Sequence, residues 1–230
     1  MATVAIDPGH GGKDPGATGH GLREKDITLA LGRRVAEILK GEGIKPILTR
    51  SDDRYVELST PRVPPCDISV SIHVNAGGGR GLEAWVGLYN QPEKSRRLGQ
   101  AIQDSVLKQI PFADRGLKSR KNSAGNADYL YMLRAAKGVP ALVEVGFIDN
   151  PGDAVVLKSS DNLDKIALGI ANGILKYLGR GQVEMKDEPS PWAKNAWDWA
   201  VGEGLFDGKN PKEPVTREQL AAVLERMIRT

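Results

Sequence analysis

Short apolar segments alternate along this chain with longer amphipathic ones, and this alternation is the feature that most constrains the fold. The segments typical of strands are Val4–Ile6, Ile44–Thr49, Asp67–His73, Leu82–Tyr89, Tyr129–Leu133 and Ala141–Phe147. The helical spacing of apolar residues predicts helices at Glu24–Lys40, Pro92–Gln109 and Asp161–Leu178, the last with Asp161 as its N-cap. The pattern predicts an α/β fold with a twisted, mostly parallel (mixed) sheet of about six strands and helices on both faces.

Proline and polar residues refine this pattern at two places. Pro46 cannot donate a backbone hydrogen bond, which places the segment Ile44–Thr49 at the edge of the sheet or at a strand start. Residues 111–128 are polar and without periodicity, so we expect them to be irregular.

A change of composition near residue 180 divides the chain. Residues 180–190 contain almost no apolar side chains, which predicts a linker between a large domain at 1–179 and a small helical hairpin at 191–230. Ser190 and Pro191 are typical of a helix start, and Thr216–Gln219 fits a capping box before the second helix. A unit of this size is too small to be stable alone, so we expect it to dock on the main domain or on a second copy, as a homodimer.

Composition excludes several classes of protein. The chain has 230 residues and a formal net charge of +3, with scattered Lys and Arg, which argues against nucleic acid as a partner. No apolar stretch approaches the roughly 20 residues that span a bilayer, so no membrane span is expected. The single cysteine excludes an internal disulfide framework. The chain begins with a strand-like segment, so we expect synthesis in the cytoplasm without a signal peptide.

Two of the three histidines follow or end predicted strands, and a glutamate opens the first helix. His10 comes just after the first strand, His73 ends the third, and Glu24 begins the helix that follows the first strand. In open α/β sheets ligands bind beyond the carboxyl ends of strands, where these side chains are expected to converge. Two imidazoles and a carboxylate are a typical catalytic zinc set. Each residue alone also has a structural reading, such as a glutamate that favours the helix dipole.

A further carboxylate lies inside an apolar strand. Glu144 stands between two valines, where an ionised side chain is costly unless it is paired, near a metal or protonated. Such surroundings raise a carboxylate pKa toward the range useful for acid and base catalysis. The alternative is a strand glutamate that faces outward to solvent.

Four motifs together resemble a known family. They are D-P-G-H-G-G-K-D-P-G-A at 7–17, E-K-D at 24–26, S-I-H-V-N-A at 71–76 and V-E-V-G-F-I-D-N at 143–150. They are similar, in family order, to the zinc-dependent N-acetylmuramoyl-L-alanine amidases of the amidase 3 type, and the resemblance covers residues 2–178. It implies one Zn²⁺ held by His10, Glu24 and His73, with Glu144 as the catalytic carboxylate. It also implies hydrolysis of the amide bond between the lactyl group of N-acetylmuramic acid and L-alanine in peptidoglycan.

Other residues near these motifs are candidates for substrate binding. Arg115 and Lys118 resemble the family's R-G-x-K stretch and are expected to meet stem-peptide carboxylates, with solvated surface charge as the alternative. Asn75 and Glu83 lie close in sequence to the second histidine and are candidates for supporting roles. His20 lies in a glycine-rich loop and is expected to be exposed and not a ligand.

The C-terminal unit resembles one S-layer homology motif. The matching stretches are W-A-K-N-A-W-D-W-A, G-L-F-D-G and P-V-T-R-E-Q-L-A-A-V-L. The resemblance implies binding to a secondary wall polymer through residues 191–230, with a dimerising or stabilising hairpin as the alternative. We therefore expect a phage or prophage endolysin, or an enzyme of mother-cell lysis. A zinc-dependent stem-peptide endopeptidase and a non-catalytic wall-binding module are the competing functions.

Overall fold

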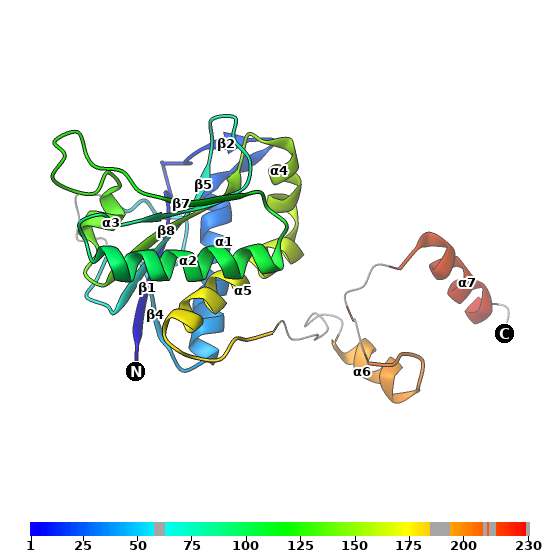
Figure 1. Ribbon diagram of the computed structural model, residues 1–230. Coiled ribbons are helices and arrows are strands. Elements are labelled where there is room, and N and C mark those ends of the chain that lie inside the picture. The colour runs from blue at the N-terminus through cyan, green and yellow to red at the C-terminus, as the bar shows by residue number, and fades with distance from the viewer. Residues whose placement is uncertain (58–62, 185–193, 209–210, 212–214, 229–230) are drawn as a thin grey trace. The chain divides into compact units, whose positions relative to one another are not determined.

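The computed structural model describes residues 1–57, 63–184, 194–208, 211 and 215–228. The chain divides into two compact units, Met1–Val183 and Glu184–Thr230 (Figure 1). The first unit contains one large sheet, and its last residues are held to a helix because the Asn172 side chain pairs with both backbone groups of Val183. The domain limits at 179 and 191 stay predictions.

The large sheet has six strands in the order β4-β1-β5-β8-β6-β7. Their bounds are β1 Thr3–Pro8, β4 Lys45–Leu48, β5 Ile68–Asn75, β6 Leu82–Val86, β7 Asp114–Lys118 and β8 Val139–Phe147. The first four in spatial order are parallel, β6 runs antiparallel to β8, and β7 is parallel to β6. The predicted α/β fold with a mostly parallel, mixed sheet is confirmed, and Pro46 does lie in an edge strand. A separate two-stranded sheet joins β2 (Thr18–Gly19) and β3 (Leu22–Arg23).

Two predictions about the middle of the chain are wrong. The segment Tyr129–Leu133, expected to be a strand, leads into the short helix α3 (Tyr131–Ala135), and the sixth strand is β7, inside the segment 111–128 expected to be irregular. Periodicity over five residues cannot separate a strand from a helix. The β7 sequence D-R-G-L-K is polar because an edge strand meets solvent, so it carries little apolar signal.

Three long helices form the main core with one face of the sheet. α1 (Glu24–Gly41) contacts β1, β4 and β5, α2 (Pro92–Gln109) contacts β6, β7 and β8, and α5 (Ser160–Tyr177) packs against both helices. The predicted N-cap Asp161 is wrong, because the Ser159 hydroxyl caps α5 by accepting from the Asn162 N–H. A short helix absent from the sequence prediction, α4 (Pro151–Lys158), precedes it and is capped by the Asn150 side chain.

Alternation along the strands gives the sheet two different faces. The side chains that join the three long helices in the core are apolar; they include Val4, Ile6, Val70, Ile72, Val143 and Val145. Their neighbours in sequence point to the opposite face, and many are polar: Asp7, Ser71, His73, Glu83 and Glu144. Met132 of α3 packs near this second face, in a small apolar cluster with Ala5 and Val63. The sheet therefore buries one face in a core and presents polar groups on the other.

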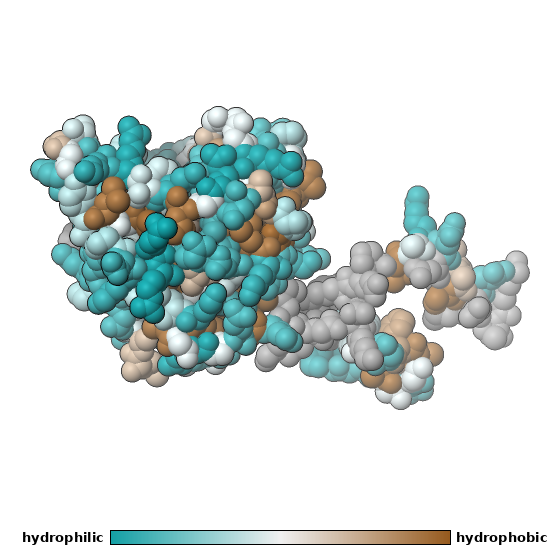
Figure 2. Space-filling model, in the orientation of Figure 1, coloured by the Kyte–Doolittle hydropathy of each residue, from teal (hydrophilic) through white to brown (hydrophobic). Residues whose placement is uncertain are grey.

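The second unit contributes two described helices, α6 (Lys194–Gly202) and α7 (Arg217–Ile228). The Trp197 ring stacks on Phe206 with ring centroids 5.1 Å apart. Trp199, Leu205 and Phe206 are exposed, and Figure 2 shows apolar side chains at the surface of this unit. Most of the predicted linker and the start of the predicted hairpin, residues 185–193, lie outside the described residues, and packing of the two helices as a hairpin stays a prediction.

No helix in the part of the chain that the structure describes is both long enough and apolar enough to cross a membrane.

Close packing of α2 on α5 depends on two glycines one helical turn apart. A Cβ atom added at Gly173 would lie 2.4 Å from the Ile102 Cα, and one added at Gly169 would lie 2.6 Å from the Val106 Cα. We predict that Gly173→Ala lowers the free energy of unfolding by about 1–3 kcal/mol, because the helices must separate. This is the net loss that remains after the gain of about 1 kcal/mol that alanine brings to a helix.

Urea unfolding followed by circular dichroism measures this effect. Gly41→Ala is the matched control, since Gly41 ends α1 with no heavy atom within 4 Å of the added Cβ. Equal stability of Gly173→Ala and the control would contradict the packing argument.

Candidate metal centre

Three side chains from separate elements converge above the polar face of the sheet. His10 follows β1, Glu24 is the first residue of α1, and His73 lies in β5. One ligand atom from each lies within 4.8 Å of the other two. The Glu24 Oε1 atom is 3.2 Å from His10 Nε2 and 3.0 Å from His73 Nδ1. The structure thus brings together the three residues that the sequence singles out as metal ligands.

Tight backbone turns make room for this convergence. His10 has a φ of 62°, in the left-handed region that few residues other than glycine adopt. A Cβ atom added at Gly9 would lie 2.4 Å from the His73 ring, and one at Gly16 would lie 2.6 Å from Glu24 Oε2. Only glycine at these two positions allows the imidazole and carboxylate groups to approach the loop.

The ring of His10 is oriented by a carboxylate that the sequence reading missed. Asp14 Oδ2 lies 2.8 Å from His10 Nδ1, and Asp14 Oδ1 accepts a hydrogen bond from the Gly16 N–H. A carboxylate on one imidazole nitrogen fixes the tautomer and leaves the other nitrogen, Nε2, free to bind a metal. Asp14 is the second aspartate of the D-P-G-H-G-G-K-D motif, so its position was visible, but its role depends on the fold of the loop.

Positive charge stabilises the carboxylates of this cluster. Burial lowers the pKa of His10, but the carboxylates of Glu24 and Asp14 outweigh this effect and raise that pKa to about 9. Burial raises the pKa of Glu24, but hydrogen bonds to His10 and His73 hold it far below its usual range. In the protein without metal, protonated imidazole therefore balances the buried carboxylate. A cation bound between these side chains would supply the same positive charge.

The donor types, and the spacing of Glu24 from each histidine, fit zinc. Two ligand atoms that each lie roughly 2.0 Å from a tetrahedral zinc ion are about 3.3 Å apart. The separations of Glu24 Oε1 from the two imidazole nitrogens, 3.2 and 3.0 Å, are close to that value. Two nitrogen ligands and one carboxylate also leave a fourth position open, as catalytic zinc sites do.

Glu144 lies beside this cluster on the same face of the sheet. In the strand register it is paired with His73 of β5 on one side and with Glu83 of β6 on the other. Its Oε2 atom is buried and has no hydrogen-bond partner among the described residues. Burial raises the pKa of Glu144 to about 7, with opposition from His73 and further support from Glu24 and Glu83. A buried carboxylate that titrates near neutrality is suited to moving a proton.

Two predicted substrate-binding residues are held by Glu83. The Asn75 amide donates to Glu83 Oε1 at 3.0 Å, and the Arg115 guanidinium donates to Glu83 Oε2 at 2.7 Å. Arg115 also stacks over the Phe147 ring. The third, Lys118, is half-buried in β7, and its side chain makes no hydrogen bond or ion pair with another described residue. Contact of these three residues with substrate stays a prediction.

The exposed histidine lies apart from the cluster. His20 Nε2 is 3.2 Å from the Asp149 carbonyl oxygen, and His20 is absent from the group of side chains that converge as metal ligands.

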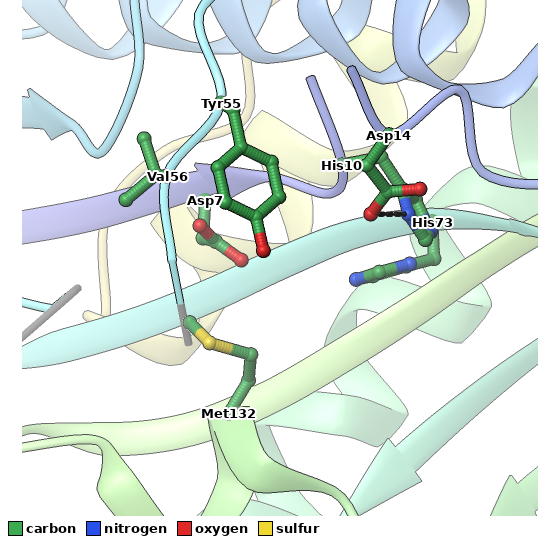
Figure 3. Close-up of a pocket in the computed structure, with 7 residues that line it drawn as sticks. All are labelled: Asp7, His10, Asp14, Tyr55, Val56, His73 and Met132. Carbon is green, nitrogen blue, oxygen red and sulfur yellow. Dashed lines mark hydrogen bonds and ion pairs between the residues drawn. The ribbon is translucent and has the colours of Figure 1, made fainter. Parts of the chain in front are cut away.

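A cavity of about 110 Å³ opens next to the histidines (Figure 3). Its lining residues are Asp7, His10, Asp14, Tyr55, Val56, His73 and Met132. The close-up shows Tyr55, Val56 and Met132 on one side and the two histidines with Asp14 on the other. The candidate ligands therefore border a space that is lined by both apolar side chains and the carboxylates of Asp7 and Asp14.

Comparison with known proteins identifies the family. The sequence model for N-acetylmuramoyl-L-alanine amidases matches residues 4–176. The chain belongs to this family. It is a hydrolytic amidase, and family and fold together support peptidoglycan as its substrate.

Three relatives illustrate the similarity. The sporulation-specific N-acetylmuramoyl-L-alanine amidase of Bacillus subtilis is 37% identical over 180 residues, which cover 76% of this chain and 67% of that protein. The endolysin of Bacillus phage SPP1 is 34% identical over 202 residues, or 81% of this chain and 72% of the endolysin. The solved structure of the amidase AmiC2 of Nostoc punctiforme superposes with a TM-score of 0.68 at 35% identity, over 78% of this chain and 98% of that one.

The hydrogen bond between Asp14 and His10 predicts a measurable effect on metal binding by this amidase. In Asp14→Asn the side chain keeps its shape and loses the charge that fixes the His10 tautomer, so zinc affinity is expected to fall by about 10- to 100-fold. Competition with a chromophoric chelator measures the affinity. His20→Ala, which removes an exposed histidine from the same loop, is expected to leave it unchanged. Equal affinity of Asp14→Asn and the wild type would contradict the assignment.

Proposed function

We propose that this amidase hydrolyses the amide bond between the lactyl group of N-acetylmuramic acid and L-alanine of the peptidoglycan stem peptide. The observation that carries the proposal is the juxtaposition of a His–Glu–His cluster with an unpartnered buried carboxylate. The cluster is His10, Glu24 and His73, and the carboxylate is Glu144 on the neighbouring strand. Family membership supports the choice of bond.

His10 Nε2, Glu24 Oε1 and His73 Nδ1 would hold a zinc ion in this proposal. When bound, zinc lowers the pKa of water and polarises a carbonyl oxygen. The second Glu24 oxygen accepts from the Ala17 N–H at 2.8 Å, and Oε1 accepts from the Val74 N–H at 2.9 Å. These bonds fix the carboxylate, so the ligand atom stays in place when the charge of the site changes.

Glu144 moves the proton. Its carboxylate accepts a proton from the attacking water as the water oxygen forms a bond to the lactyl carbonyl carbon. Glu144 then delivers that proton to the nitrogen of L-alanine, and the carbon–nitrogen bond breaks. A carboxylic acid, which then ionises in solution, and a free amine result, and no covalent bond to the enzyme forms. A pKa of about 7 suits both halves of this transfer, because the group accepts and releases a proton at neutral pH.

Substrate contacts are proposed on the same face of the sheet. Lys118, whose side chain has no ion-pair partner among the described residues, is the cation proposed to meet a stem-peptide carboxylate. Arg115 and Asn75 contribute through Glu83, which they hold next to Glu144.

We propose that residues 191–230, which lie within the second unit, bind a secondary wall polymer. Support comes from its exposed aromatic and aliphatic side chains, among them Trp199 and Phe206. Association with a second copy is the alternative; the described part of the chain offers no support for a homodimer.

The names of two relatives support the proposed biological setting. They are a sporulation-specific amidase and a phage endolysin, which supports action on the cell wall as a phage or prophage lysin or in mother-cell lysis.

Digestion of purified peptidoglycan tests the reaction. We expect new free amines of L-alanine without new reducing sugars, and loss of this activity with a chelator. New termini deeper in the stem would indicate an endopeptidase, and no release would indicate a binding module.

The Glu144→Gln variant tests the role of Glu144. Its side chain cannot accept a proton, so the rate of hydrolysis is expected to fall by about 10²- to 10⁴-fold while zinc stays bound. Full activity of Glu144→Gln would exclude the proposed proton transfer.

The pair of carboxylates on β6 and β8 predicts a shift in pH dependence. Glu144 must be ionised to accept a proton, so kcat/KM falls on the acid side as Glu144 becomes protonated. The negative charge of Glu83 raises the pKa of Glu144. In Glu83→Gln that charge is lost, the Glu144 carboxylate is more stable, and the acid limb of the profile is expected at lower pH.

A pH profile of kcat/KM for both enzymes measures the shift. Glu93→Gln removes an exposed carboxylate at the start of α2 and is expected to leave the profile unchanged. A shift of Glu83→Gln to higher pH would contradict the electrostatic role of Glu83.

A further inference from the structure

A fully buried arginine, Arg50, contacts the segment that leads from β1 to His10. Arg50 follows the edge strand β4 and has no exposed surface. A charged group in the interior is costly unless hydrogen bonds satisfy it. The hydrogen-bond acceptors of the Arg50 guanidinium therefore indicate the role of this buried side chain.

Each nitrogen of the guanidinium donates to oxygen atoms of neighbouring segments. Nε donates to the Pro8 carbonyl at 3.0 Å, and Nη1 donates to the Asp52 carbonyl at 3.1 Å. Nη2 donates to the Gly9 carbonyl at 3.0 Å, the Lys25 carbonyl at 2.8 Å and the Thr28 hydroxyl at 3.1 Å. One side chain thus joins the loop after β1 to the first turn of α1.

The acceptors lie directly beside two candidate ligands. Gly9 precedes His10, and Lys25 follows Glu24, so a single nitrogen of Arg50 links the residue before one ligand to the residue after the other. Thr28 closes the arrangement, because its hydroxyl donates to the Gly9 carbonyl at 2.8 Å. The loop at His10 has left-handed backbone that local sequence alone stabilises poorly.

We propose that Arg50 is a positioning residue that fixes His10 and Glu24 at the separation that zinc requires. The inference rests on the proposed function, since it assumes that these residues hold the metal. Arg50 itself is not one of the candidate ligands. It acts by holding the two backbones from which the ligand side chains project.

The geometry requires arginine and not merely a cation. The guanidinium presents donors on three nitrogens in a fixed plane, so it reaches Pro8, Gly9 and Lys25 at once. A lysine has one nitrogen on a flexible stem and cannot reproduce these bonds. If only the buried charge mattered, Arg50→Lys would keep the metal site intact.

The proposal is tested by the affinity for zinc. The protein is first stripped of metal, and zinc binding is then measured by competition with a chelator. We expect Arg50→Lys and Arg50→Met to bind zinc about 10- to 100-fold more weakly than the wild type. Thr28→Val, which removes one acceptor and one donor, is expected to bind more weakly by a smaller factor. The visible absorption of bound Co²⁺, which reports ligand geometry, is expected to change in the Arg50 variants.

A matched control separates positioning from general stability. Leu39→Ala removes a fully buried side chain near the other end of α1. It is expected to lower the melting temperature and to leave zinc affinity and the Co²⁺ spectrum unchanged. All variants are compared at a temperature at which circular dichroism shows them folded.

The outcomes distinguish this inference from the proposed function. If the wild type binds no zinc, the proposed function fails. If the wild type binds zinc and folded Arg50→Lys binds it equally well with the same Co²⁺ spectrum, the role of Arg50 is wrong and the proposed function stands. If neither Arg50 variant folds, Thr28→Val decides: unchanged affinity overturns the inference, and weaker affinity supports it.

Discussion

Alternation of side chains along the central strands is the constraint on which the rest of this structure depends. Successive residues of a strand point to opposite faces, so the apolar residues of β5 enter the core beneath the long helices while Ser71 and His73 point the other way. The same alternation on β6 and β8 places Glu83 and Glu144 on that second face. A sheet with one face in the core is rigid, and its other face can therefore hold polar groups in fixed positions.

Charge balance on the polar face explains the chemistry. Glu24 lies between two imidazoles and accepts hydrogen bonds from backbone N–H groups, which keeps it ionised despite burial. Glu144, on the strand next to His73, has a buried Oε2 without a hydrogen-bond partner among the described residues, and burial raises its pKa. Two buried glutamates near one another are thereby given different properties by their surroundings, one suited to hold a cation and the other to transfer a proton.

Glycines and one arginine make the convergence of distant segments possible. Gly9 and Gly16 remove the Cβ atoms that would collide with His73 and Glu24. Arg50 donates hydrogen bonds to the backbone carbonyls of Gly9 and Lys25, the residues next to His10 and Glu24. The site thus combines room for close approach on one side with a hydrogen-bonded support on the other, and both are needed because His10 lies in left-handed backbone.

Sequence by itself determined the α/β class and the three long helices, and it singled out the three side chains that converge as candidate ligands, because periodicity and motifs are local properties. It did not determine the sixth strand, the short helix α3, the cap at Ser159 or the roles of Asp14 and Arg50. An exposed edge strand carries little apolar pattern, and five residues do not fix a period. The contacts of Arg50 with Pro8, Gly9 and Lys25 join residues 25 to 42 positions apart, so only the tertiary structure decided them.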